Sequence, residues 1–155
     1  MKFNVNQNDL EQSLGYCQGV IEKRSTLPIL SNILLDANNS KLSIIATDLD
    51  LIFINEIKNV EIIEEGKTTT TSSIMYDIIR KFSSGKKINF SLSSENKIQL
   101  ESEKSIFNLN CISASEFPLT DENFTGNEFK IKSKQLLKLL NKCKFAISND
   151  ETRHY

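Results

Sequence analysis

The chain has 155 residues, of which 39% are apolar and 25% charged, and its formal net charge is −1. This length fits about one ordinary globular domain, and the charge excludes binding of nucleic acid through an overall positive field. Three scattered cysteines and a single histidine predict no metal site and no cofactor. The sequence has neither the apolar core of a signal peptide nor a membrane-spanning stretch of roughly 18 apolar residues. We therefore expect a cytoplasmic protein that does not contact the membrane.

The first 30 residues predict a strand, a helix and a loop. Phe3 and Val5 lie on one face of a strand over residues 2–6. Asn8 or Asp9 offers an N-cap for the helix that follows. The apolar stripe of this helix has the spacing of one helical face and consists of Leu10, Leu14, Cys17 and Ile21. A loop then extends over residues 23–29.

The middle of the chain predicts short strands around one further helix. Alternating apolar residues and a run of threonines favour extended structure. The expected strands cover residues 32–36, 42–46, 49–53, 57–63, 68–71, 88–92, 98–100 and 107–109. A helix capped by Ser72 or Ser73 has an apolar stripe that ends at Phe82, before Gly85. Residues 113–127 form a polar loop, which is the best candidate for a domain boundary.

An internal repeat follows this loop. Moving the first residues forward by 126 positions places Phe3 on Phe129 and Cys17 on Cys143, with four further apolar matches between and beyond them. The repeat predicts a strand over residues 128–132 and a helix with the stripe Leu136, Leu140, Cys143 and Ile147. We therefore expect one complete domain at residues 1–125 and the start of a second, similar domain at residues 128–155. A strand and one helix cannot bury their apolar faces alone, which predicts a fragment of a longer repeat protein.

Few residues have the arrangement of a catalytic site. A nucleophilic triad would depend on His154 alone. Asp48 and Asp50 form a D-x-D pair that could hold a divalent cation in a transferase. The alternative interpretation is a turn in which these carboxylates accept hydrogen bonds from backbone N–H groups.

Basic residues are unevenly distributed along the chain. Lys134, Lys138 and Lys142 recur every four positions, opposite the apolar stripe of the last helix, and no acidic residue stands between Glu128 and Asp150. Smaller clusters are Lys23-Arg24, Arg80-Lys81 and Lys86-Lys87. A solvated helix face is the ordinary interpretation of such a row. A near-neutral protein with segregated charge can also hold a polyanion locally and without sequence preference.

Several motifs together resemble the bacterial DNA polymerase III beta subunit over the whole chain. They are Met1-Lys2-Phe3, the run from Arg24 to Asn32, Ala46-Thr47-Asp48-Leu49-Asp50, Glu116-Phe117-Pro118 and Arg153-His154-Tyr155. The resemblance implies an α+β fold of the DNA-clamp type. It comprises a first domain of antiparallel sheets with two helices on one face, followed by the first strand and helix of a second such domain.

The resemblance also implies a function without catalysis. Family members are sliding clamps, processivity factors in DNA replication that close as a dimeric ring around double-stranded DNA and tether the polymerase. They are accessory subunits of a DNA-directed DNA polymerase, a transferase. DNA polymerase III and the clamp loader bind a pocket in later domains of the family. Two alternatives stay open: a metal-dependent nucleotidyl or glycosyl transferase using Asp48 and Asp50, and a β-rich interaction module that does not bind DNA.

Carried over by motif, the resemblance assigns two groups of residues. The expected contacts with the DNA backbone are Lys23, Arg24, Ser73, Asn149, Arg153, His154 and Tyr155. Ser73 stands where some members have arginine, which puts that contact in doubt. The expected contacts with the second clamp subunit are Ile74, Ile78, Phe107 and Leu109. Burial in the core of the domain is the alternative interpretation for these four.

Overall fold

The computed structural model describes residues 1–21, 27–93, 96–119 and 129–147. The chain divides into two compact units, Met1–Leu119 and Thr120–Tyr155. No helix in the described ranges is long and apolar enough to cross a membrane.

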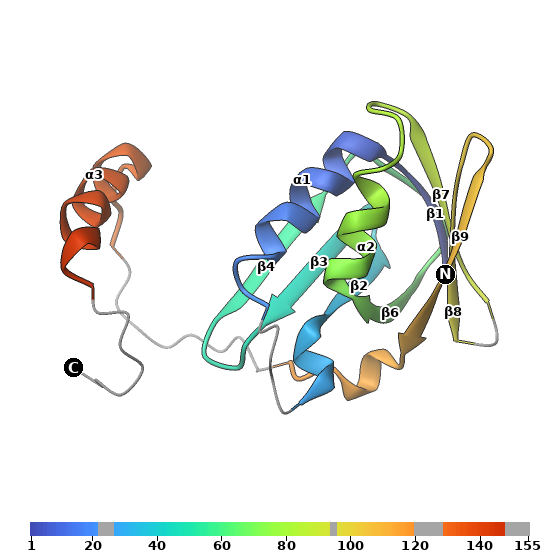
Figure 1. Cartoon of the computed structure of the whole chain (residues 1–155), viewed down its shortest axis with the longest axis horizontal. Helices are drawn as coiled ribbons and strands as arrows, with labels where there is room; N and C mark the ends of the chain where they lie inside the picture. Colours follow the sequence, from blue (N-terminus) through green and yellow to red (C-terminus); the bar gives the residue numbers. More distant parts are fainter. Residues whose placement is uncertain (22–26, 94–95, 120–128, 148–155) are drawn as a thin grey trace. The chain divides into compact units, whose positions relative to one another are not determined.

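The first unit combines antiparallel strands with two α-helices that lie side by side (Figure 1). The helices are α1 (Gln7–Cys17) and α2 (Ser72–Ile79), and two short 3-10 helices are η1 (Pro28–Ser31) and η2 (Ala114–Glu116). The strands are β1 (Lys2–Asn6), β2 (Asn32–Asn38), β3 (Lys41–Thr47), β4 (Ile52–Ile57), β5 (Val60–Glu64), β6 (Gly66–Thr71), β7 (Lys87–Leu92), β8 (Lys97–Ser102) and β9 (Ser105–Ile112). The predicted α+β class is confirmed.

The strands pair in the order β4-β3-β2-β6-β9-β8-β7-β1-β5, and each adjacent pair is antiparallel. The junction between β6 and β9 is short, because only Thr69 and Thr70 pair with β9. Both threonine hydroxyls strengthen this junction. Thr69 donates to the Ile112 carbonyl at 3.0 Å, and Thr70 donates to the Asn110 carbonyl at 3.2 Å. The threonine run is therefore a buried strand whose polar groups are satisfied.

The core of the first unit contains the apolar faces that the sequence pattern predicts. Strand β3 buries alternate residues, Leu42, Ile44 and Ala46, and α1 buries Leu10, Leu14 and Cys17. The rings of Phe3 and Phe90 stack in this core with their centroids 4.3 Å apart. Alternation on strands and helical spacing on α1 thus bring side chains from distant segments into one cluster.

The helices are shorter than predicted. Helix α1 ends at Cys17 rather than reaching Ile21, whose N–H bonds to the Cys17 carbonyl at 3.1 Å in a turn that contains Gly19. Its N-cap is Asn6, two positions before Asn8, and the Asn6 side chain accepts from the Asn8 N–H at 2.9 Å. Helix α2 ends at Ile79, and Phe82 follows in a turn. Local hydrogen bonds in these turns compete successfully with the last predicted helical turns.

Two predicted strands differ because turn residues interrupt them. Strand β4 begins at Ile52, not at Leu49, because Leu49 has a φ of 83° that is incompatible with a strand. The expected strand over residues 57–63 is divided at Lys58 and Asn59, so that Ile57 ends β4 and Val60 begins β5. Since β4 and β5 stand at opposite ends of the strand order, this turn carries the chain from one end of the sheet to the other.

A smaller apolar group lies outside the main core. Leu34 is buried on the opposite face of β2 from Ile33 and Leu35, which belong to the core cluster. Leu30 on η1 and Phe117 after η2 are also buried outside that cluster. Helix η1 packs on β2 and η2 packs on β6. The two motifs around Pro28 and Phe117 therefore supply short helices that cover this part of the sheet.

The second unit contains helix α3 (Ser133–Cys143), followed by the 3-10 helix η3 (Lys144–Ala146). Helix α3 begins and ends at the positions of α1 shifted by 126 residues. The expected strand over residues 128–132 is not confirmed, since residues 129–132 are described without strand structure. A strand requires a hydrogen-bonded neighbour, and no strand of the described residues pairs with this segment. The expected stripe also ends early, because Ile147 follows η3.

Candidate nucleic-acid interface

Helices α1 and α2 contact each other through Gly15 and Tyr76. A β-carbon at Gly15 would lie 3.6 Å from the hydroxyl oxygen of Tyr76 on α2. Gln18, just after α1, donates from Nε2 to the Ser72 hydroxyl at 2.8 Å. These contacts hold the exposed sides of the two helices next to each other (Figure 1).

The start of α1 is fixed to the loop between α2 and β7. Asn6 donates from Nδ2 to the Gly85 carbonyl at 3.1 Å. The Asn8 side-chain oxygen accepts from the Gly85 N–H at 3.1 Å and from the Ser84 hydroxyl at 2.8 Å. Gly85 has a φ of 74°, which favours glycine there. The end of the helical layer is thus rigidly connected to the sheet.

The exposed side of α1 and α2 has no basic residue, and Asp77 adds an exposed carboxylate. On α1 the exposed residues are Asn8, Gln12 and Tyr16, and α1 contains no lysine or arginine. On α2, Ser73 is exposed in the first turn, as a DNA contact requires, but its hydroxyl has no charge. Attraction for a phosphate backbone must therefore come from outside these two helices.

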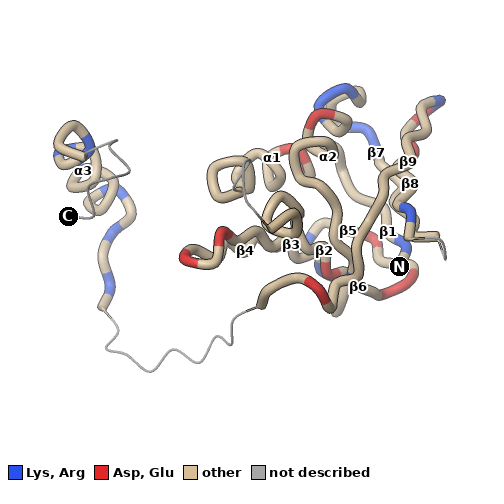
Figure 2. The backbone as a smooth tube through the Cα atoms, turned by 60° about the horizontal axis from the view of Figure 1, so that its bottom comes forward, with Lys and Arg blue, Asp and Glu red and all other residues tan. Residues whose placement is uncertain are grey.

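Acidic residues alternate with the basic residues of the first unit (Figure 2), and ion pairs lower the net positive charge of most of its basic clusters. Arg80 lies over the Tyr76 ring at 5.3 Å and approaches Asp77 at 3.8 Å. Lys86 pairs with Glu103 at 3.2 Å, and Lys87 pairs with Glu61 at 2.5 Å. Hydrogen bonds from Lys86 and Ser83 keep the pKa of Glu103 below its ordinary value, so this partner stays ionised at neutral pH. Glu61 lies on β5 and Glu103 in the turn between β8 and β9, far from Lys86 and Lys87 in the sequence, so the sequence pattern alone did not identify these two partners.

Most of the predicted DNA contacts lie outside the described residues. They are Lys23, Arg24, Asn149, Arg153, His154 and Tyr155. Among the expected DNA contacts, only Ser73 has a described position.

The four expected subunit contacts fall into two groups. Ile74 is 51% exposed and Phe107 is 37% exposed, whereas Leu109 is 7% exposed and belongs to the core. Ile78 is half-buried and packs against that core. Leu109 therefore fits the alternative interpretation, burial in the core of the domain. Of the four residues, only Ile74 and Phe107 are exposed. Phe107 also contacts Phe82 edge to face, with ring centroids 5.6 Å apart.

A free strand edge accompanies Phe107. Strand β9 pairs with β8 through Ser105 to Asn110 and with β6 only through Cys111 and Ile112. In the described residues, the first half of β9 therefore has one hydrogen-bonded neighbour, and β4 at the end of the sheet order also has one. Such edges present unpaired backbone groups to another strand.

The Asp48–Asp50 segment is a turn. Asp48 Oδ1 accepts from the N–H groups of Asp50 at 3.1 Å and Leu51 at 2.6 Å. Within the described ranges, no group of three or more potential metal ligands forms. This geometry matches the turn interpretation and gives the metal-dependent transferase no support.

We expect Asp48→Ala to lower the free energy of unfolding by about 1 kcal/mol, because two backbone N–H groups lose their acceptor. Asp48→Asn keeps an acceptor oxygen and should stay within about 0.5 kcal/mol of the original chain. Urea denaturation followed by circular dichroism measures both. Equal losses for the two variants would contradict the turn account.

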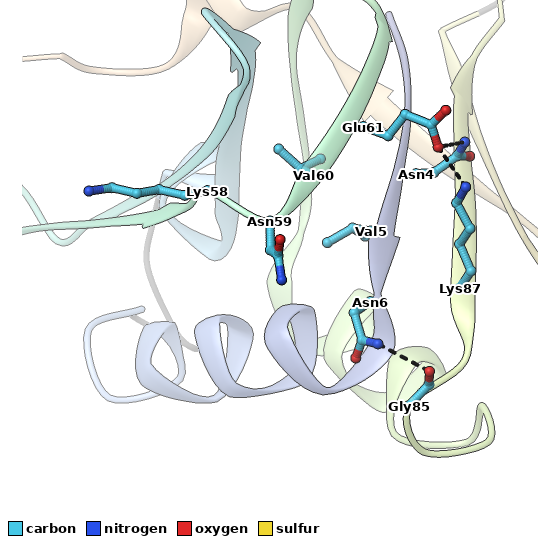
Figure 3. Close-up of a pocket in the computed structure, with 9 residues that line it drawn as sticks. All are labelled: Asn4, Val5, Asn6, Lys58, Asn59, Val60, Glu61, Gly85 and Lys87. Atoms are coloured by element: carbon cyan, nitrogen blue, oxygen red, sulfur yellow. Dashed lines mark hydrogen bonds and ion pairs between the residues drawn. The ribbon is translucent and has the colours of Figure 1, made fainter.

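A polar hollow of about 430 Å³ lies beside β1, β5 and the turn that joins β4 to β5 (Figure 3). Its carboxylate, Glu61, accepts from Lys87 at 2.5 Å and from Asn4 at 3.0 Å. The hydrogen bond from Lys87, then that from Asn4, keeps the Glu61 pKa below its ordinary value. Glu61, Lys87 and Asn4 thus satisfy each other, and Lys58 is the remaining charged residue of the lining.

Helix α3 presents a different surface. Lys134, Lys138 and Lys142 line one shallow hollow together with Leu137 and Asn141. The ion pairs of the described residues all lie in the first unit. Among the described residues, the three lysines of α3 therefore have no carboxylate partner.

The fold is that of the DNA sliding clamps. The crystal structure of the Caulobacter crescentus beta sliding clamp superposes with a TM-score of 0.93 at 36% identity, covering 100% of this chain and 41% of that one. A sliding clamp from Bartonella birtlesii, bound to griselimycin, gives a TM-score of 0.94 at 36% identity, covering 100% of this chain and 41% of that one.

The family model of the DNA polymerase III beta subunit, N-terminal domain, matches residues 1–121, and the chain belongs to this family. The beta sliding clamp of Caulobacter vibrioides (strain NA1000 / CB15N) is 36% identical over 156 residues, which cover 100% of this chain and 42% of that protein. The beta sliding clamp of Escherichia coli (strain K12) is 30% identical over 155 residues, with coverage of 100% and 42%. The chain thus spans about two fifths of the length of these relatives.

Proposed function

We propose that this chain supplies the first part of a sliding clamp, a processivity factor that encircles duplex DNA and tethers a replicative polymerase. The observation that carries the proposal is the likeness of the whole chain to the Caulobacter crescentus clamp, with a TM-score of 0.93 at 36% identity. The chain acts in DNA replication in the cytoplasm as a non-catalytic accessory subunit. The polymerase and the clamp loader bind parts of the clamp that lie outside this chain.

Free strand edges favour a chain of similar domains. An edge strand can continue a sheet into a neighbouring domain, and here the first half of β9 and β4 have this property. Ile74 and Phe107 supply exposed apolar surface, and we assign them to the contact with a second clamp subunit. Leu109 is omitted from this contact because it is buried in the core.

The second unit is, in this proposal, the start of a second copy of the first domain. The equal bounds of α1 and α3, 126 positions apart, support it. So does the exposure of Leu136 and Leu140 on α3, at 42% and 58%, where their counterparts on α1 are buried. A complete second copy would bury this face.

DNA is held through its backbone and without sequence preference. Arg24, Asn149 and Tyr155, which the family resemblance assigns to DNA, remain proposed contacts, as do Lys23, Arg153 and His154. Ser73 can donate a hydrogen bond to a phosphate but adds no charge.

A chimera tests the function. The corresponding first part of the Caulobacter vibrioides clamp is replaced with this chain, and the chimera is loaded on closed circular DNA. We expect it to stay bound through gel filtration and to be released when the DNA is linearised, because a ring is held by topology. A folded, dimeric chimera that is lost equally fast from circular and linear DNA would contradict the proposal.

A further inference from the structure

Strand β9 joins two parts of the strand order, β4-β3-β2-β6 and β8-β7-β1-β5. Its first six residues pair with β8, whereas its last two, Cys111 and Ile112, pair with β6. The half that pairs only with β8 carries Phe107, which we assign to the contact with a second clamp subunit. The direction of this free half is therefore set at the short crossing where β9 leaves β6.

Two threonine hydroxyls hold this crossing from opposite faces of β6. Successive side chains of a strand point to opposite faces, so Thr69 and Thr70 approach β9 from different sides. Thr69 donates to the Ile112 carbonyl at 3.0 Å, and Thr70 donates to the Asn110 carbonyl at 3.2 Å. Both threonines are buried. Because the two bonds act from opposite faces, they oppose rotation of β9 in either direction.

Asn32, at the start of β2, directs the Thr69 hydroxyl toward β9. Its side-chain oxygen accepts from the Thr71 hydroxyl at 3.2 Å, and its Nδ2 donates to the Thr69 hydroxyl oxygen at 3.3 Å. A hydroxyl has a single proton to donate. Since the Thr69 oxygen accepts from Asn32, its proton is left for the Ile112 carbonyl. Asn32 is itself buried, so solvent does not compete for these bonds.

We propose that Thr69, Thr70 and Asn32 are positioning residues that orient the free half of β9, and with it Phe107, for contact with a second clamp subunit. Valine would fill the two threonine positions with nearly the same shape, so packing alone does not require hydroxyls there. A buried polar network in which every group is bonded makes one arrangement rigid. The inference rests on the proposed clamp function and adds buried residues to its subunit contact.

The double variant T69V/T70V tests the inference in the chimera with the Caulobacter vibrioides clamp. Valine keeps the β-branched shape and the preference for strands, but it removes both donors to β9. The free half of β9 must then be reordered before it pairs with the second subunit. We therefore expect the dissociation constant of the dimer to rise about tenfold, measured by analytical ultracentrifugation over a concentration series.

Thr68 offers the matched control. It is 2% exposed and lies on the same strand and the same face as Thr70, but its hydroxyl is not one of the two that bond to β9. The variant T68V should keep the original dissociation constant within about twofold, and T69S/T70S, which keeps both hydroxyls, should restore it. A T69V/T70V chimera that is less stable in urea yet dimerises like the original would overturn the inference.

Hydrogen exchange of the whole chain gives a second measurement that needs no second subunit. In T69V/T70V the amides of Phe107 and Leu109 should exchange about tenfold faster, whereas those of Phe3 and Val5 on β1 should keep their rates. Equal acceleration on both strands would overturn the inference, because the variant would then only destabilise the domain. A chimera that fails to dimerise with the original threonines, combined with selective exchange on β9, would count against the clamp function alone.

Discussion

Replacing Phe90 with alanine should lower the free energy of unfolding of the first unit by about 3 to 5 kcal/mol. Phe90 on β7 is 1% exposed and stacks on Phe3 of β1, with the rings 12° from parallel. Truncation removes this contact and leaves a cavity, because the close-packed core can relax only partly around the missing ring. Because small domains are stable by only about 5 to 15 kcal/mol, the variant should unfold at a much lower urea concentration.

Phe145 offers the matched control. It lies in η3 and is 89% exposed, so Phe145→Ala removes the same atoms without opening a cavity. Its effect on the main unfolding transition should stay within about 0.5 kcal/mol. Urea denaturation monitored by circular dichroism compares the two variants. Similar midpoints for both would mean that the Phe3–Phe90 stack does not stabilise the fold.

The sequence predicts those elements whose residues repeat with a clear period. Leu42, Ile44 and Ala46 alternate and are all buried, and Leu10, Leu14 and Cys17 define the buried side of α1. The repeat at a spacing of 126 residues predicts helix α3, although the observed helix ends at Cys143, before the predicted stripe does. In each case a single face must meet the core, and that requirement fixes the spacing of the apolar side chains.

The boundaries that sequence patterns miss depend on single backbone conformations. Leu49 continues an apolar alternation, yet its positive φ ends the pattern, because Asp48 and Thr47 accept from backbone groups of the turn. The turn at Lys58 and Asn59 lacks glycine and proline and gives no composition signal. Charges are missed for a different reason. The pairing of Lys86 with Glu103 depends on which strands become neighbours, a property of the tertiary fold.

In the candidate interface, too, the sequence predicts some features and the tertiary fold determines others. Motif resemblance assigns Ile74, Ile78, Phe107 and Leu109 as one group, but side-chain direction separates them, because Leu109 points into the core. The lysine row of α3 is visible in the sequence.

Cys17 should resist thiol reagents as long as the first unit is folded. It is fully buried on α1, and burial raises the pKa of its thiol to about 12. The reactive species is the thiolate. A pKa of about 12 leaves far less thiolate at neutral pH than the ordinary value of 9.0 does. Cys143 is exposed, and we expect it to react rapidly with 5,5′-dithiobis(2-nitrobenzoic acid).

The pH dependence of stability has a definite sign. Because the folded pKa of Cys17 lies above the ordinary value of 9.0, burying the neutral thiol costs nothing below that pH. Between pH 9 and about pH 12 the thiol ionises in the unfolded chain but not in the folded one. The folded state therefore loses stability as the pH rises through this range. The folded chain should therefore unfold more readily in alkali. The variant Cys17→Ala should lose less of its free energy of unfolding between pH 9 and pH 12.

Three measurements complete this test. Cys143→Ala should remove a fast labelling phase, Cys17→Ala should leave that phase unchanged, and urea should make Cys17 as reactive as an ordinary thiol. Labelling of Cys17 in the absence of urea then requires unfolding, so its rate should increase as the stability of the core decreases. Phe90→Ala should therefore accelerate it strongly. Rapid labelling of Cys17 in the folded original chain would contradict both its burial and the packing of α1 on the sheet.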